Sequence, residues 1–221
     1  MISMKRVSFA VALFAAFGMA GPLTAAPQTP PAALDPQSNA LFKRMVALNH
    51  GLHTYEAVVH FDVALRTFPF LSPSLDGNVY YKEPDKEAVV FDTVPLLAAQ
   101  FKKVYPRIDP PVSWLSLYEV AVLSDDGASS VFRLVPKKNG RVEHLDVVVD
   151  DASATIKGYT WTYKDGGYVT FDQQFTSIGG NYLVQKQSGH VDLPNYKADI
   201  ESTFSDYKLN VAIQDSVFQG N

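Results

Sequence analysis

The chain has 221 residues, of which 47% are hydrophobic and 12% aromatic, so it carries enough apolar side chains to bury a sizeable core. Its formal net charge of −4 at pH 7 excludes the basic character of a typical nucleic-acid-binding domain. Cysteine is absent, which excludes disulfide bonds and a thiol nucleophile.

The N-terminal residues 1–25 have the features of a secretory signal peptide. Lys5 and Arg6 give a positive start, an apolar run follows, and small residues offer cleavage after Ala25 or Ala20. The apolar run is shorter than the roughly 20 residues that a membrane-spanning helix needs. We therefore expect an exported protein.

Residues 26–37 are rich in proline and are expected to form a flexible leader. The remaining residues, 38–221, do not exceed the roughly 200–250 that one all-β domain can reach. We expect them to form a single domain.

Two short helices are expected from apolar residues at helical spacing. Asp35 or Ser38 would cap the first helix, which would extend to the neighbourhood of Gly51. The second covers residues 93–105, and its end is set by Pro106 and the prolines that follow. Their apolar stripes consist of Leu41, Met45, Leu48 and Leu52 in the first helix and Leu97, Phe101 and Val104 in the second.

The rest of the chain alternates apolar and polar residues with a period of two, which is typical of half-buried antiparallel strands. The clearest strand covers residues 54–67, and residues 78–91 read as a hairpin. A meander with an unusually aromatic face extends from Arg141 to Phe175. Further strands are expected over residues 117–123, 130–135, 181–190, 196–204 and 207–213.

Two helices cannot cover one face of a flat sheet of about ten strands, so the sheet must curl, close or form a sandwich. We expect a mainly β fold with two or three short helices. It would be a strongly curved, antiparallel, incomplete barrel with the helices as a lid over an apolar cavity. A two-sheet sandwich is the alternative, but it leaves the apolar stripes of the helices without a partner.

Candidate catalytic and metal-binding groups are few. His50 and His53 have no third ligand at a recognisable spacing, so we interpret them as a surface pair. Ser188 and His190 are expected on opposite faces of a strand, which would exclude a catalytic pair. No Gly-x-Ser-x-Gly motif is present. We expect no catalytic residue, metal or cofactor. An unrecognised hydrolase is therefore a weaker hypothesis than either of the two non-enzymatic functions considered below, a carrier and a sensing or protein-binding module.

The remaining signal is a set of large apolar residues on the predicted strands and helices. For any single residue, filling the core is the ordinary role. A sheet curled around short helices can enclose more volume than side chains fill, and such a cavity suits an acyl chain or another hydrophobic ligand. The predicted lining residues are Phe61, Val63, Phe91, Leu97, Phe101, Phe132, Trp161, Tyr163 and Phe171.

Four features together resemble a known family. They are the long strand Tyr55–Leu65, the hairpin that begins Gly77-Asn-Val-Tyr-Tyr-Lys-Glu-Pro, the meander with Trp161-Thr-Tyr-Lys-Asp-Gly-Gly, and the closing stretch from Tyr207. Over Leu41–Phe218 the sequence resembles the LolA-like family of periplasmic lipoprotein-carrier proteins.

The resemblance implies a periplasmic, non-enzymatic monomer that binds a lipid or lipoprotein acyl chain. It also implies an inner-membrane transporter and an outer-membrane acceptor as partners. Two departures limit it: the arginine-proline-glycine stretch of typical carriers is replaced by Lys82-Glu83-Pro84, and Arg66 is only a candidate for the family's lid-holding arginine. The alternative is an envelope sensing or protein-binding module with a solid core.

Overall fold

The computed structural model describes residues 32–36, 38–67, 70, 72–92 and 108–219. They lie in one compact unit that extends from Pro31 to Asn221. The signal peptide and the second helix that the sequence predicts lie outside the described residues.

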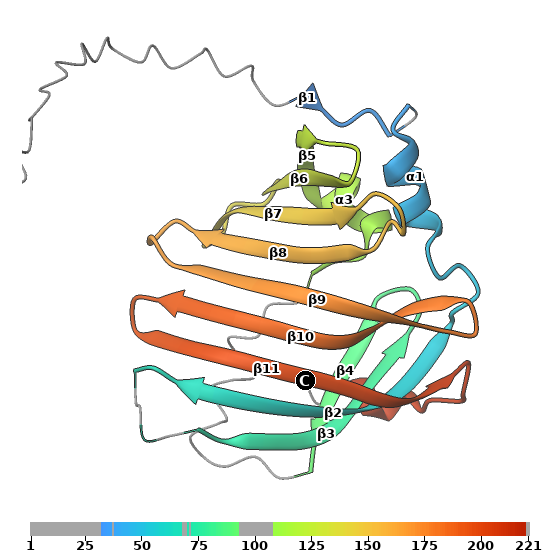
Figure 1. Cartoon of the computed structure of the whole chain (residues 1–221), viewed down its shortest axis with the longest axis vertical. Helices are drawn as coiled ribbons and strands as arrows, with labels where there is room; N and C mark the ends of the chain where they lie inside the picture. The colour runs from blue at the N-terminus through green and yellow to red at the C-terminus, as the bar shows by residue number, and fades with distance from the viewer. Residues whose placement is uncertain (1–31, 37, 68–69, 71, 93–107, 220–221) are drawn as a thin grey trace, which may run out of the picture. The chain divides into compact units, whose positions relative to one another are not determined.

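Eleven strands among the described residues form a single sheet (Figure 1). The strands are β1 (Ala32–Ala33), β2 (Thr54–Leu65), β3 (Ser74–Lys82), β4 (Lys86–Phe91), β5 (Tyr118–Asp125), β6 (Ser129–Pro136), β7 (Val142–Asp150), β8 (Ile156–Tyr163), β9 (Tyr168–Ile178), β10 (Asn181–Leu193) and β11 (Tyr196–Leu209). Their order in the sheet is β1-β5-β6-β7-β8-β9-β10-β11-β2-β3-β4, and every neighbouring pair is antiparallel.

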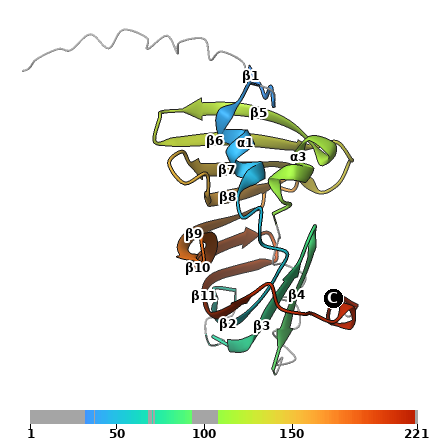
Figure 2. The same cartoon turned by 90° about the vertical axis from the view of Figure 1, so that its right-hand side faces the viewer.

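The sheet is strongly curved and does not close. In Figure 2, β3 and β4 stand at a steep angle to β5–β8, and the two ends of the sheet do not pair with each other. The prediction of a mainly β, antiparallel, incomplete barrel with short helices is therefore confirmed.

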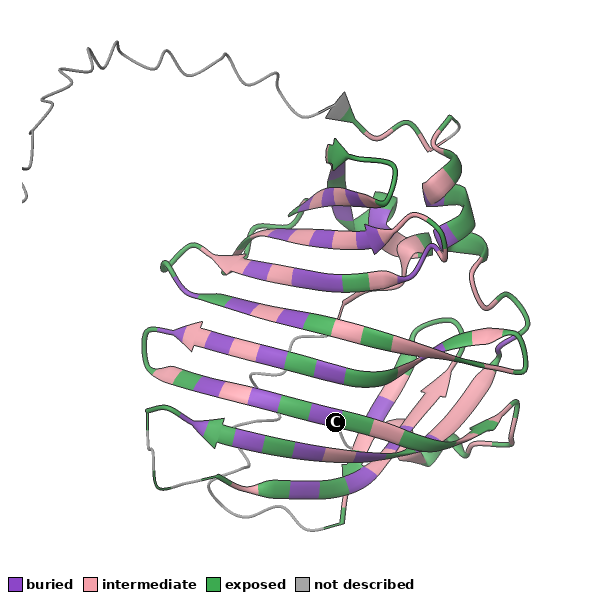
Figure 3. Ribbon diagram, in the orientation of Figure 1, coloured by how far each residue is buried: buried purple, intermediate pink, exposed green. Residues whose placement is uncertain are grey.

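Alternation along the strands separates a buried face from an exposed face (Figure 3). On β2, for example, Val59, Phe61 and Val63 are at most 2% exposed, whereas Val58 and Asp62, at the alternate positions, face solvent. Side chains that alternate in a strand point to opposite faces of the sheet. The buried face therefore forms one continuous core across β5–β11 and β2–β3.

Two helices pack against the β5–β8 end of this core (Figure 2). In α1 (Ala40–Ala47) the ring of Phe42 lies 6.2 Å from that of Trp114, and Trp114, in α3 (Pro111–Leu117), lies 6.1 Å from Phe132 of β6. Trp114 is completely buried and donates its Nε1–H to the Asp109 carbonyl at 2.7 Å. This tryptophan joins the two helices to the sheet.

Three local predictions were wrong. The side chain of Asn39, rather than that of Asp35 or Ser38, caps α1 and accepts from the Phe42 amide at 2.7 Å. Helix α3 was missed because Pro110 and Pro111 were interpreted as terminators, although proline also favours the first turn of a helix.

The third error concerns the last predicted strand, over residues 207–213. Tyr207–Leu209 instead continue β11 after an irregularity in its pairing with β2, and the chain then leaves the sheet. It ends in a short 3-10 helix, η2 (Asp215–Phe218). Asp215 accepts from Lys82 at 2.9 Å and from Lys86 at 3.2 Å, so η2 is attached to the β3–β4 hairpin.

Candidate functional site

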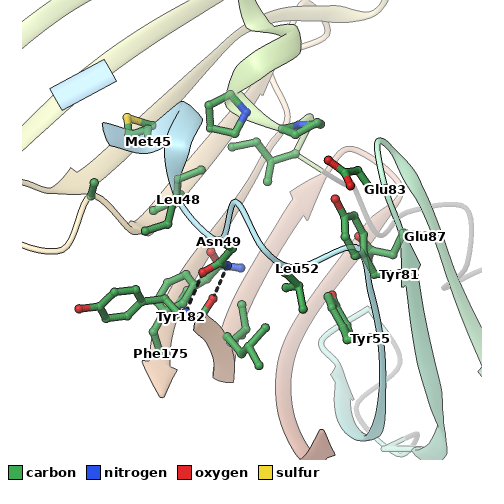
Figure 4. Close-up of a pocket in the computed structure, with 18 of the residues that line it drawn as sticks. Met45, Leu48, Asn49, Leu52, Tyr55, Tyr81, Glu83, Glu87, Phe175 and Tyr182 are labelled. Carbon is green, nitrogen blue, oxygen red and sulfur yellow. Dashed lines mark hydrogen bonds between the residues drawn. The ribbon is translucent and has the colours of Figure 1, made fainter. Parts of the chain in front are cut away.

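A cavity of about 630 Å³ lies between the C-terminal end of α1 and the sheet (Figure 4). Its walls come from α1, the segment that connects α1 to β2, the start of α3, and strands β2–β4 and β8–β11. Most of the lining is apolar or aromatic, and the volume is within the roughly 300–1,000 Å³ of typical small-molecule sites.

One wall, which we call the α1 wall, consists of Met45 in α1 and of Leu48 and Leu52 in the segment that follows the helix; Asn49 fixes its position (Figure 4). Asn49 has a φ of 58°, a left-handed conformation that asparagine tolerates better than most residues. Its side-chain amide exchanges two hydrogen bonds of 2.8 Å with the backbone N–H and C=O of Tyr182 in β10. The end of α1 is thereby tied to the opposite side of the cavity.

Tyrosines form the wall at the β2–β3 side. The ring of Tyr55 stacks on that of Tyr81 at 5.2 Å and meets the edge of Tyr207 at 5.5 Å. The Tyr207 hydroxyl donates to the Val184 carbonyl at 2.6 Å, and burial raises the pKa of this hydroxyl. The three rings present apolar faces to the cavity, and the Tyr207 hydroxyl stays protonated at neutral pH.

A polar group of three residues interrupts the apolar lining on β8, β9 and β10. Gln187 donates its Nε2–H to the Tyr159 hydroxyl at 2.8 Å, and Gln173 is the cross-strand neighbour of Gln187. Tyr159 and Gln187 are only 4% and 3% exposed, so both polar side chains are buried although they line the cavity. Burial raises the pKa of Tyr159.

The charged lining residues that the structure describes are Glu83 and Glu87, both at the β3–β4 hairpin (Figure 4). The Nδ1 atom of His53 lies 2.6 Å from the Glu83 carboxylate, so the predicted surface pair of histidines separates: His53 binds this glutamate, whereas His50 lines the cavity. Among the described residues no group of three or more His, Asp or Glu is arranged to hold a metal ion.

The predicted lining residues that are described do not line this cavity. Five of them are core residues with 0–7% exposure: Phe61, Val63, Phe132, Trp161 and Phe171. Phe91 is half-buried with its ring 5.6 Å from that of Phe61, and Tyr163 is half-buried beneath the Arg141 guanidinium at 4.9 Å. Leu97 and Phe101 lie outside the described residues. A contact between these nine residues and a ligand stays a prediction.

Phe171 shows how the core is filled. A Cβ atom placed on Gly189, its cross-strand neighbour, would lie 2.2 Å from the Phe171 ring. The ring therefore lies over the glycine and occupies the space that a side chain would take. Large side chains fill the inner face here.

The cavity residues that sequence reasoning missed are mostly at strand ends. Tyr55 was predicted only as part of the long strand, and Tyr81 and Tyr182 were not singled out as lining residues. A tyrosine at the end of a strand is a usable signal, because it combines an apolar ring with a polar tip that reaches solvent.

Two other sequence interpretations concern the outer face. Ser188 and His190 lie on the same face, not on opposite faces, since residues two apart in a strand share a side. Each has its own partner: Ser188 donates to Glu201 at 2.8 Å, and His190 lies 2.6 Å from Asp199. Arg66 also pairs with Asp199, at 3.3 Å, so this candidate lid-holding arginine binds to the outer face of the sheet.

Comparisons with known proteins identify the fold. No family model matches the sequence, and no curated protein matches it. Solved structures do match. A DUF1329 family protein from Desulfovibrio piger has a TM-score of 0.63 and 12% identity, over 81% of this chain and 95% of that one.

Two further structures have the same architecture. A putative outer membrane lipoprotein-sorting protein domain from Vibrio parahaemolyticus has a TM-score of 0.59 and 12% identity, over 80% of this chain and 93% of that one. A LolA superfamily protein from Nitrosomonas europaea has a TM-score of 0.58 and 14% identity, over 84% and 98%. The fold is LolA-like.

The LolA-like fold agrees with the resemblance that the sequence motifs indicated. The cavity lies between the short helices and the curved sheet. Within the described residues, no helix has the length and apolar character needed to cross a membrane.

Proposed function

We propose that this chain is an exported, periplasmic carrier that holds a lipid or the acyl chain of a lipoprotein in the cavity. The observation that carries this proposal is the cavity of about 630 Å³ with a mainly apolar and aromatic lining, in a fold shared with a lipoprotein-sorting domain. Burial of an acyl chain gains about 0.8 kcal/mol per methylene group. A carrier of this kind performs no chemistry on its ligand.

The fold similarity also suggests the partners. An inner-membrane transporter would deliver the acyl chain and an outer-membrane acceptor would receive it. Release requires the cavity to open, and we place this opening at the end of α1, where two hydrogen bonds from Asn49 to β10 connect the two sides of the cavity.

A second candidate function is a non-enzymatic sensing or protein-binding module. The observation in its favour is the solid core: Phe61, Phe132 and Phe171 are at most 2% exposed and fill space that a ligand would otherwise take. On this alternative the cavity would be a surface cleft without a ligand.

A test uses protein purified without detergent, native mass spectrometry and a fluorescent apolar probe. The Leu48→Asp substitution places a charge in the α1 wall, so we expect it to abolish lipid-sized adducts and probe uptake. Val58→Asp is the matched control, because Val58 is 40% exposed on the outer face of β2.

The carrier is supported if the unaltered protein and Val58→Asp take up the probe and Leu48→Asp does not. Uptake by none of the three, with native circular dichroism spectra, would favour the sensing module instead.

A further inference from the structure

The polar group at the buried end of the cavity is the feature that an acyl-chain site alone does not explain. Tyr159, Gln173 and Gln187 are contributed by three neighbouring strands, β8, β9 and β10. In the next strand, β11, Ser202 is the cross-strand neighbour of Gln187, and its hydroxyl is buried without a hydrogen-bond partner among the described residues. A row of polar side chains thus crosses an otherwise apolar inner face.

Buried polar groups cost free energy unless they are hydrogen-bonded. The Tyr159 oxygen accepts from Gln187 at 2.8 Å, which leaves the tyrosine O–H as a donor. No residue in the described part of the chain accepts a hydrogen bond from it, and the Gln173 amide likewise has no hydrogen-bond partner there. Both side chains line the cavity.

The protonation state of Tyr159 supports a donor role. Burial raises the pKa of its hydroxyl, and the negative charge of Glu87 raises it further. The hydroxyl therefore keeps its proton at any physiological pH and offers a neutral donor to a ligand.

Burial at this end favours a neutral ligand group. Tyr159 and Gln187 are 4% and 3% exposed, so a ligand carboxylate would lose its hydration on entry without a cation among the described lining residues to pair with. A carbonyl oxygen of an ester or amide loses much less on desolvation and can accept the tyrosine proton.

We propose that the cavity selects acyl esters and acyl amides over free fatty acids, with the ligand carbonyl accepting a hydrogen bond from the Tyr159 hydroxyl. This inference rests on the proposed carrier function and names its ligand class. The Gln173 amide oxygen would accept the N–H of an amide ligand, which an ester lacks.

The experiment compares four ligands with similar chains: methyl oleate, oleamide, oleate and 1-octadecene. Each competes with a fluorescent apolar probe for the full chain at pH 8, where oleate is ionised, below the concentration at which the ligands aggregate. We expect the ester and the amide to compete about tenfold better than oleate or the hydrocarbon, since one hydrogen bond and the charge penalty are each of that order.

Tyr159→Phe removes only the hydroxyl group, and we expect it to lower the ester-to-hydrocarbon preference about 5- to 10-fold. Gln173→Leu should lower the preference for oleamide and leave that for methyl oleate. Tyr182→Phe is the control, because it deletes the same group from a lining residue that is 37% exposed.

The outcomes separate the two proposals. Displacement of the probe by none of the four ligands would overturn the carrier itself. Equal displacement by all four, or an unchanged ester preference in Tyr159→Phe, would overturn only the selection for carbonyl groups. If Tyr159→Phe does not fold, the ranking of the four ligands on the unaltered protein still decides the question.

Discussion

The β5–β8 end of the sheet and the cavity are built from the same kind of strand but are filled differently. Where α1 and α3 pack on the sheet, Trp114 of α3 and Phe132 and Val147 of the sheet are not exposed at all. Around the cavity, Tyr55, Phe175 and Tyr207 are only half-buried, and space remains between them. The difference indicates that the helix-covered end is tightly packed and supplies stability, whereas the side chains around the cavity are packed less tightly.

The largest effect is expected where helices and sheet meet. Trp114→Ala removes the ring that lies between Phe42 and Phe132, and such a truncation costs about 3–5 kcal/mol of unfolding free energy. Urea denaturation followed by circular dichroism measures it. Val112→Ala in the same helix is the control, because Val112 is 65% exposed. A loss below about 1 kcal/mol for Trp114→Ala would mean that the helices are not part of the stabilising core.

The same valine-to-phenylalanine substitution at the filled end and at the cavity wall tests this difference in packing directly. Val147→Phe adds volume to the filled end and should cost about 1–3 kcal/mol or more through overpacking. Val184→Phe adds the same volume to the cavity wall, so we expect a cost below about 1 kcal/mol together with weaker uptake of an apolar probe. Equal costs at the two sites would show that the cavity is filled by protein in solution.

Most of the strands of the sheet could be predicted from the sequence. Alternation placed β2, β7, β8 and β9 correctly, because a half-buried strand must alternate, and the shortage of helices required the curvature. The motifs between Tyr55 and Tyr207 indicated the family of folds to which the structure is similar.

The candidate site was less accessible to sequence reasoning. Alternation shows which side chains point inward, but it does not tell a residue that fills the core from one that lines a cavity. Phe171 and Tyr159 have the same inward pattern, and only the glycine opposite Phe171 decides that its ring is core. The Asn49 connection depends on a pairing of residues 133 positions apart, which no local pattern encodes.

A smaller effect is expected at that connection. Asn49→Gly keeps the left-handed backbone but loses both hydrogen bonds to Tyr182, at a cost of about 1–2 kcal/mol. Asn49→Ala should cost about 1 kcal/mol more, because alanine is strained at a φ of 58°. Hydrogen exchange of the Tyr182 amide should accelerate in both variants. An unchanged exchange rate would mean that α1 is held to β10 by other contacts.

The smallest effect is expected at η2, where exposed charges attach the chain end to the hairpin that carries Glu83 and Glu87. Hydrogen bonds from Lys82 and Lys86 lower the pKa of Asp215 below its usual value of 3.8. A lowered pKa in the folded state stabilises the attachment above the unfolded value, and the contribution is lost as the pH falls through the folded value. The attachment should therefore weaken below about pH 4 and in high salt, because the pair is exposed.

Hydrogen exchange of residues 211–219 at neutral pH measures this attachment without unfolding the protein. We expect Asp215→Asn to speed the exchange of this segment and to leave the exchange of β6 and β7 unchanged, because no core contact is altered. Adding 0.5 M NaCl, roughly enough to shorten the screening length to a few ångströms, should speed exchange in the unaltered protein and have little further effect in Asp215→Asn. If the variant instead exchanges faster in β6 and β7 as well, the cavity side and the helix-covered end are coupled more tightly than their different packing indicates.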